Sequence, residues 1–152
     1  MELSTAIEFI RQRRQGVLAT IRSNGMPQLS NILYIAEGGA GSSGSEIGAS
    51  SHYSIDISIT DSRAKTKNLR RDPRSSLYVV GDNFWQYVVL ECNAELSPVA
   101  HSVDDETVER LVGMYRIAAG EHPDWKEFRQ VMVSEQRLVL TLRPERAYGL
   151  LS

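Results

Sequence analysis

The pattern of hydrophobic and polar positions is most regular over residues 53–60, which read YSIDISIT. Hydrophobic residues occupy every second position: Tyr53, Ile55, Ile57 and Ile59. A period of two predicts a β-strand that buries one face. The complete set of expected strands covers residues 16–21, 28–35, 53–60, 76–81, 85–96 and 137–143, with AYGLL at 147–151 as an extension of the last.

Hydrophobic residues at helical spacing predict helices over residues 4–14, 103–119 and 123–133. Ser4 is the expected cap of the first helix. Ser102 is the expected cap of the second, because Asp105 follows it three positions later, as in a capping box. Pro123 stands near the start of the third helix, where proline is tolerated.

Turn residues between the hydrophobic runs predict that neighbouring strands pair as hairpins. The pair Asn24–Gly25 tolerates positive φ at both positions, and Asp82–Asn83 marks a second turn. The Gly/Ser-rich stretch 37–51 is expected to form a flexible loop. Strands that follow one another without regular helical crossovers favour a small barrel. The sequence therefore predicts one α+β domain over residues 1–152, with about six antiparallel strands and peripheral helices.

Composition limits the class of protein further. Of the 152 residues, 41% are hydrophobic, which is enough for a core. No hydrophobic run approaches the roughly 20 residues of a membrane span, and the N-terminal MELSTAIEFIRQRRQ does not read as a secretory signal. Cys92 is the one cysteine, so no internal disulfide can form and a reducing, cytoplasmic location is expected. We expect no membrane partner.

Positive charge is concentrated in residues 60–73, TDSRAKTKNLRRDP, which hold five basic and two acidic residues. The rest of the chain holds 12 basic and 17 acidic residues, and the whole has a net charge of -2 and a pI near 5.9. A nucleic-acid-binding domain usually spreads basic charge over a broad face. The distribution favours a compact anion site, while a solvated helix face stays the plain alternative.

The basic segment follows a strand whose exposed face carries Ser58 and Thr60. A helix that starts at Arg63 would point Lys65 away from the other basic side chains. Lys65 need not point away from Arg63 if residues 63–65 belong to the turn between the strand and the helix. The start of a helix favours anions in either case.

Sequence patterns for metal binding and side-chain catalysis are not found. The three histidines, His52, His101 and His122, form no ligand-spaced pair, and Cys92 has no cysteine partner. No nucleophile–base arrangement, Walker motif or GxGxxG motif stands out. We therefore predict no metal site and name no catalytic residue.

Five stretches carry a resemblance to a known family: GVLATI, NGMPQLSN, SRAKTKNLRRDPR, WQYVVLE and LVGMYRIAAGEHPDWKEFRQVMV. With them the chain resembles the pyridoxamine 5'-phosphate oxidase-like split β-barrel flavoproteins, and more closely their branch that binds the deazaflavin F420. The resemblance covers the chain except for the Gly/Ser-rich insert. It implies a six-stranded split β-barrel and a homodimer with two cofactor sites at the interface.

The resemblance also assigns cofactor-binding residues: Gln28, Ser30, Asn31, Ser58, Arg63, Lys65, Thr66, Asn68, Trp85 and Tyr87. Arg63 and Lys65 would bind the phosphate and acidic tail, and the side chains of Thr66 and Asn68 would add hydrogen bonds. The polar residues of the second and third expected strands would line the ring and ribityl groups. The two aromatic residues, two apart on an expected strand, would come from the partner subunit.

The function implied is an F420-dependent oxidoreductase that transfers a hydride between the deazaflavin and an unsaturated small molecule. Arg70 and Arg71 add positive charge that suits the long anionic tail of F420 better than the single phosphate of FMN. Two alternatives stay open: an FMN-dependent oxidase or reductase of the pyridoxamine-phosphate-oxidase type, and a non-catalytic carrier of flavin or F420. Nucleic acid is not expected as a partner.

Overall fold

The computed structural model describes residues 1–37 and 53–152. Its helices are α1 (Leu3–Arg11), α2 (Ala64–Arg71), α3 (Glu106–Ala119) and α4 (Trp125–Ser134). Its strands are β1 (Gln15–Ile21), β2 (Pro27–Leu33), β3 (Ile35–Glu37), β4 (Ser54–Thr60), β5 (Arg74–Val80), β6 (Tyr87–Leu96) and β7 (Arg137–Leu150). The flexible loop expected over 37–51 lies, beyond its first residue, outside the described residues.

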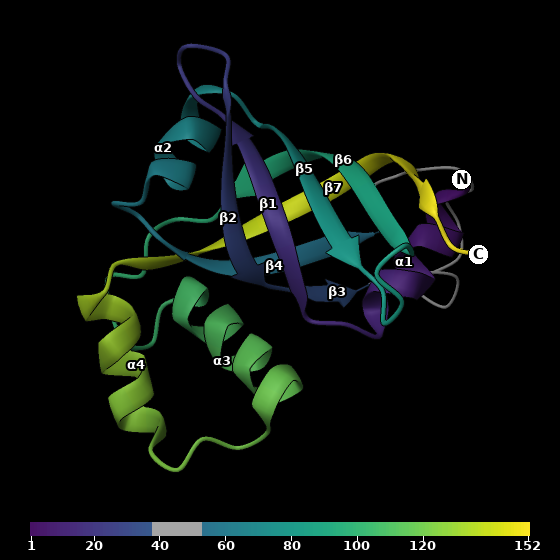
Figure 1. The fold of residues 1–152 in the computed structure, drawn as a ribbon. Helices are drawn as coiled ribbons and strands as arrows, with labels where there is room; N and C mark the ends of the chain where they lie inside the picture. The colour runs from purple at the N-terminus through teal and green to yellow at the C-terminus, as the bar shows by residue number, and fades with distance from the viewer. Residues whose placement is uncertain (38–52) are drawn as a thin grey trace, which may run out of the picture.

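The strands form one curled antiparallel sheet in the order β2-β1-β5-β6-β7-β4-β3. Figure 1 shows the curl, with α2 at one end of the half-barrel, α1 at the other, and α3 and α4 outside it. The predicted α+β barrel with peripheral helices is confirmed. The expected hairpin at Asn24–Gly25 is also confirmed, because β1 pairs with β2 and Gly25 has a φ of 86°.

The sheet has seven strands rather than six, because the expected strand 28–35 is divided at Tyr34. The Tyr34 N–H donates to the Arg14 carbonyl at 2.8 Å, and its hydroxyl donates to the Ile10 carbonyl at 2.7 Å. β2 pairs with β1, whereas β3 pairs with β4. One predicted strand thus supplies both edge strands of the sheet, β2 and β3.

The main core lies inside the half-barrel and under α1. Alternation along β4 places Ile55, Ile57 and Ile59 inside, as predicted, and each is at most 1% exposed. Buried residues of the other strands and of α1 complete this core, among them Ile7, Ile10, Leu18, Leu77, Leu90, Leu138, Leu140 and Leu142. Burial of this many aliphatic side chains is the main driving force for the fold.

A second, smaller core lies where α3 and α4 cover the outer face of β7, and it includes Leu111, Met132 and Val139. At the far end of this helical pair four rings contact one another edge-to-face or tilted: Tyr115, His122, Trp125 and Phe128. These ring contacts join α3 to α4, the helix that precedes β7.

Two expected helix caps are wrong. Ser4 lies inside α1, because the helix begins at Leu3 and its N-cap is Glu2. Asp105, rather than Ser102, caps α3, because the Asp105 carboxylate accepts from the Val108 N–H at 2.9 Å. No helix among the described residues combines the length and hydropathy needed to cross a bilayer.

Candidate functional site

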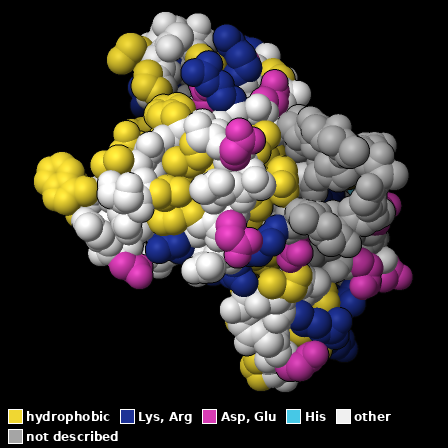
Figure 2. Space-filling model, turned by 90° about the vertical axis from the view of Figure 1, so that its right-hand side faces the viewer, with side chains coloured by type: hydrophobic (Ala, Val, Ile, Leu, Met, Phe, Trp, Pro, Cys, Tyr) yellow, Lys and Arg dark blue, Asp and Glu magenta, His cyan; other side chains and the backbone are white. Residues whose placement is uncertain are grey.

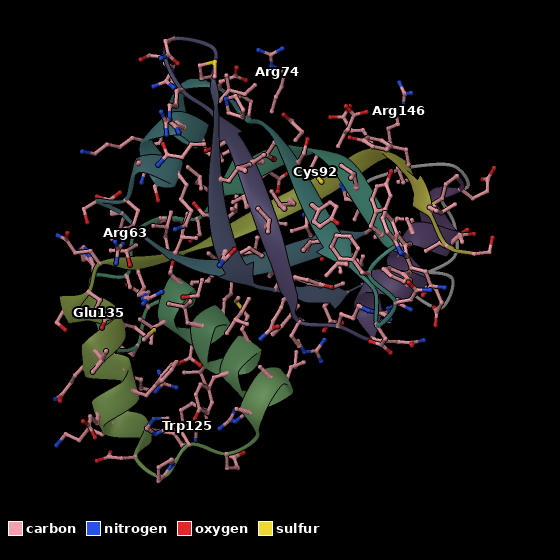
Figure 3. The ribbon with its side chains drawn as sticks, in the orientation of Figure 1. Arg63, Arg74, Cys92, Trp125, Glu135 and Arg146 are labelled. Atoms are coloured by element: carbon pink, nitrogen blue, oxygen red, sulfur yellow. The ribbon has the colours of Figure 1, made fainter. Side chains whose placement is uncertain are left out.

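Two turns meet at one corner of the molecule, the turn from β4 to α2 and the turn from α4 to β7. The Asp61 N–H of the first turn donates to the Gln136 carbonyl of the second at 3.0 Å. Arg63 and Glu135, labelled in Figure 3, lie at this corner. The contact brings the basic segment against the start of the last strand.

Positive side chains gather at this corner. Lys65 is half-buried in the first turn of α2, and Arg63 is the N-cap residue of that helix. Burial lowers the pKa of Lys65, and the charges of Arg63 and Arg137 lower it further. The lowered pKa thus reflects burial of the ammonium group first and the nearby like charges second, and a bound anion would offset the repulsion among these charges. We call Ser58, Arg63, Lys65 and Arg137 the basic corner.

Ser58 lies on the outer face of β4, where the Arg137 Nη1 atom is 3.4 Å from its hydroxyl oxygen and 3.5 Å from its carbonyl oxygen. The structure therefore brings together three predicted residues, Ser58, Arg63 and Lys65. Sequence reasoning missed Arg137, which opens β7 opposite Thr60. The signal that would have found it is the register between β4 and β7, which the sequence pattern alone does not fix.

Arg70 and Arg71 are engaged elsewhere. The Arg70 guanidinium forms an ion pair of 2.6 Å with Asp61, and the Arg71 guanidinium donates to the Ile21 carbonyl at 2.7 Å. These contacts hold α2 against the sheet. The expectation that Arg70 and Arg71 are both available to bind the anionic tail of F420 therefore loses its support.

The side chains of Thr66 and Asn68 make hydrogen bonds within the protein. The Thr66 hydroxyl donates to the Thr60 carbonyl at 2.8 Å. The Asn68 amide donates to the Thr20 hydroxyl at 3.1 Å and to the Gln28 side chain at 3.2 Å. Both residues thus fix α2 in place, and the predicted hydrogen bonds to a cofactor stay a prediction.

The three predicted residues of β2 do not share a face. Gln28 and Ser30 are half-buried on the inner side, whereas Asn31 is exposed on the outer side. Asn31 lines a groove of about 420 Å³ over β2, β1 and β5 together with Tyr78 and Val80. Asn31 is therefore separated from Gln28 and Ser30 by the strand itself.

Trp85 and Tyr87 lie at the opposite end of the barrel from α2. The expectation that both stand on one strand is wrong for Trp85, because β6 begins at Tyr87 and Trp85 belongs to the preceding turn. Trp85 is 71% exposed and packs edge-to-face on Phe84, while Tyr87 stacks on Tyr78. β5, of seven residues, separates this turn from α2 by roughly 20 Å.

Apolar side chains gather on the outer side of the sheet, and the strand register places them on one face: Leu29, Leu33, Tyr78, Val80, Tyr87, Tyr148 and Leu150. We call this set the apolar face. Leu29 and Leu33 are each 67% exposed. Hydrophobic side chains also gather on the left-hand part of the barrel in Figure 2, where one aromatic ring projects clear of the surface. A contiguous apolar surface of this kind is typical of an interface or a ligand site.

The family model described as pyridoxamine 5'-phosphate oxidase matches residues 5–151. The chain belongs to this family. The resemblance inferred from the five sequence stretches is thereby confirmed.

Solved structures of similar proteins share the fold. An F420 reductase is 17% identical with a TM-score of 0.62, over 93% of this chain and 94% of that one. A conserved hypothetical protein from Mycobacterium tuberculosis is 25% identical with a TM-score of 0.66, over 97% and 82%. The heme storage protein of Vibrio cholerae is 16% identical with a TM-score of 0.62, over 98% and 95%.

Proteins of similar structure thus differ in what they bind, so the ligand of this chain has to be argued from its site. The basic corner suits a phosphate or carboxylate group. Among the described residues no group of three metal-ligating side chains is found. The prediction that the chain holds no metal stays a prediction.

Proposed function

We propose that the protein is an F420-dependent oxidoreductase that reduces an unsaturated small molecule. The observation that carries the proposal is the basic corner, where Arg63 and Lys65 stand beside Arg137 and the pKa of Lys65 is lowered. An anion bound there would relieve the repulsion among these charges. The similarity to an F420 reductase supports F420 as the cofactor.

The residues of the basic corner fit the anionic part of this cofactor. Arg63 and Lys65 bind its phosphate, and Ser58 offers a hydroxyl on the neighbouring strand. When bound and reduced, F420 supplies a hydride from its deazaflavin ring. The chain itself binds and orients the cofactor and excludes water. This division agrees with the sequence, in which no catalytic side chain is identified.

A homodimer belongs to the same proposal. Trp85 and Tyr87 are roughly 20 Å from α2 within one subunit, so a second copy is needed to bring them to a site at the basic corner. The apolar face supplies a surface on which two copies can pack. Leu33→Glu places a charge in that face and is expected to give a monomer by light scattering and a weaker affinity for F420. A dimer with unchanged affinity would contradict this part of the proposal.

FMN binding is the second candidate, and the pairing of Arg70 with Asp61 and of Arg71 with Ile21 favours it. With these two arginines engaged within the protein, fewer cationic side chains are available, which suits the single phosphate of FMN better than the phosphate and glutamate tail of F420. An FMN enzyme would use the same basic corner.

Fluorescence titration of the purified protein with F420 and with FMN tests the proposed function. Saturable binding of F420 at micromolar concentration, with FMN at least tenfold weaker, is the expected result. Tighter binding of FMN would reject F420 as the cofactor. If F420 binds, its reduced form is then mixed with enones, quinones and tetrapyrroles; no oxidation with any of them would favour a carrier over an enzyme.

A further inference from the structure

We propose that Arg137 is the third cationic ligand of the bound anion, and that Glu135 pairs with its guanidinium in competition with that anion. The proposal rests on the proposed function in that the anion is part of the cofactor. It goes further because it assigns a ligand on the last strand and a carboxylate that competes with the anion.

The contacts of Arg137 are unequal. Its Nε atom donates to the Glu135 carboxylate at 2.9 Å, whereas its Nη1 atom reaches the two oxygens of Ser58 only at 3.4 and 3.5 Å. Bonds near 2.9 Å are strong and those near 3.5 Å are weak. A guanidinium has five N–H donors, so these contacts leave donors that can turn toward an anion.

The backbone places Arg137 firmly. It opens β7 in register with Thr60, and the preceding residue, Gln136, accepts a hydrogen bond from the Asp61 N–H. The same turn carries Glu135, so the arginine and its carboxylate partner are two residues apart in the chain. A ligand supported by regular structure is held in the geometry that binding needs.

Charge explains why Glu135 pairs with Arg137 in the free protein and competes with the anion. Burial lowers the pKa of Lys65 most, and the positive charges of Arg63 and Arg137 lower it further, so like charges repel one another across the corner. The Glu135 carboxylate offsets part of this charge. Its side chain is 45% exposed and that of Arg137 is 31% exposed, so the pair is open to solvent and the carboxylate can move away. An incoming phosphate then takes over the position beside the guanidinium.

Substitutions at Arg137 and Glu135 therefore have opposite predicted effects on anion binding. Arg137→Gln removes a ligand and should weaken F420 binding about tenfold, the effect of losing roughly 1.4 kcal/mol. Glu135→Gln removes the competitor and should tighten binding about threefold. Lys126→Gln is the matched control, because Lys126 is exposed near the start of α4, about 14 Å from Glu135 along the helix.

Titrations with F420, FMN and sulfate separate the possible failures, with sulfate binding measured as a shift in melting temperature. If F420 binds but Arg137→Gln and Glu135→Gln both behave like Lys126→Gln, the inference is wrong and the proposed function stands. If neither F420 nor FMN binds but sulfate stabilises the protein in an Arg137-dependent way, the inference stands and the proposed function is wrong. Binding of none of the three rejects both. A folding defect cannot imitate the expected result, because misfolding would weaken binding in both variants.

Discussion

The backbone N–H of Asp61 donates to the carbonyl oxygen of Gln136 at 3.0 Å, and this bond joins the two turns that form the basic corner. Gln136 has a φ of 54°, in the left-handed region that residues other than glycine rarely adopt. Surrounding structure has to hold it there, because the left-handed conformation costs roughly 1–2 kcal/mol.

Gln136→Val is expected to lower the free energy of unfolding by about 1–2 kcal/mol, because a β-branched residue tolerates positive φ poorly. Gln130→Val is the matched control on the exposed side of α4, where the same change meets an ordinary helical backbone and costs under about 1 kcal/mol. Urea denaturation of both variants measures the difference. Equal losses would show that the turn at Gln136 is not under strain.

Asn68→Ala is expected to lower the free energy of unfolding by about 1–3 kcal/mol. The change leaves the fully buried Thr20 hydroxyl without its donor and frees α2 from Gln28. Lys67→Ala, at the exposed neighbouring position, should cost no more than about 0.5 kcal/mol. Thermal and urea denaturation compare the two. A loss no greater for Asn68→Ala would mean that this hydrogen-bond network does not hold the helix.

Much of the fold could be predicted from the sequence because it depends on local patterns. Alternation identifies β4 and its inward face, and the pair Asn24–Gly25 marks the first hairpin. The break at Tyr34 could not be predicted, because it depends on hydrogen bonds to Arg14 and Ile10 in another element. Strand register is equally non-local.

The candidate site shows the same division between local and non-local information. Arg63 and Lys65 fall in one short basic segment that charge density marks, and the family resemblance assigns these two residues to the anion. Arg137 lies far along the chain and joins them only through the pairing of β4 with β7. The resemblance grouped Asn31 with its neighbours on β2, whereas alternation within the strand places it on the other face.

Asp105 should make the stability of α3 depend on pH. Burial raises the pKa of its carboxyl, but the N–H groups of Val108, Ser102 and His101 outweigh burial and bring the pKa below 3.8. A carboxyl with a lowered pKa stabilises the fold above its unfolded pKa and loses that contribution as the pH falls through the folded value. Asp105→Ala should therefore cost about 1 kcal/mol at neutral pH and progressively less below pH 4.

Urea denaturation of the wild type and Asp105→Ala across this pH range measures the dependence. Asp104→Ala is the control, because Asp104 is the exposed neighbour that does not cap the helix. A constant difference from neutral pH to pH 3 would contradict the role of the carboxylate as a cap.

Cys92 is expected to be inert in the folded protein. It is buried, and burial together with the carboxylates of Glu145 and Glu91 raises the pKa of its thiol to about 12. At pH 8 only about one thiol in ten thousand would be ionised, and the thiolate is the reactive form. Labelling with a thiol reagent should therefore be slow in buffer and fast in urea. Rapid labelling of the native protein would mean that the strand around Cys92 opens readily.

Lys65 should make anion binding weaken at alkaline pH. Its pKa lies below 10.5 in the free protein because burial and the charges of Arg63 and Arg137 disfavour its ammonium form. A bound anion favours that form and raises the pKa, so the two equilibria are linked. As the pH rises from neutrality toward 10.5, Lys65 loses its proton and affinity for sulfate, whose own charge is constant, should fall. Lys65→Arg should bind sulfate with little pH dependence, because the guanidinium stays charged. If both proteins show the same pH profile, Lys65 is not a ligand of the anion and the basic corner depends on its arginines alone.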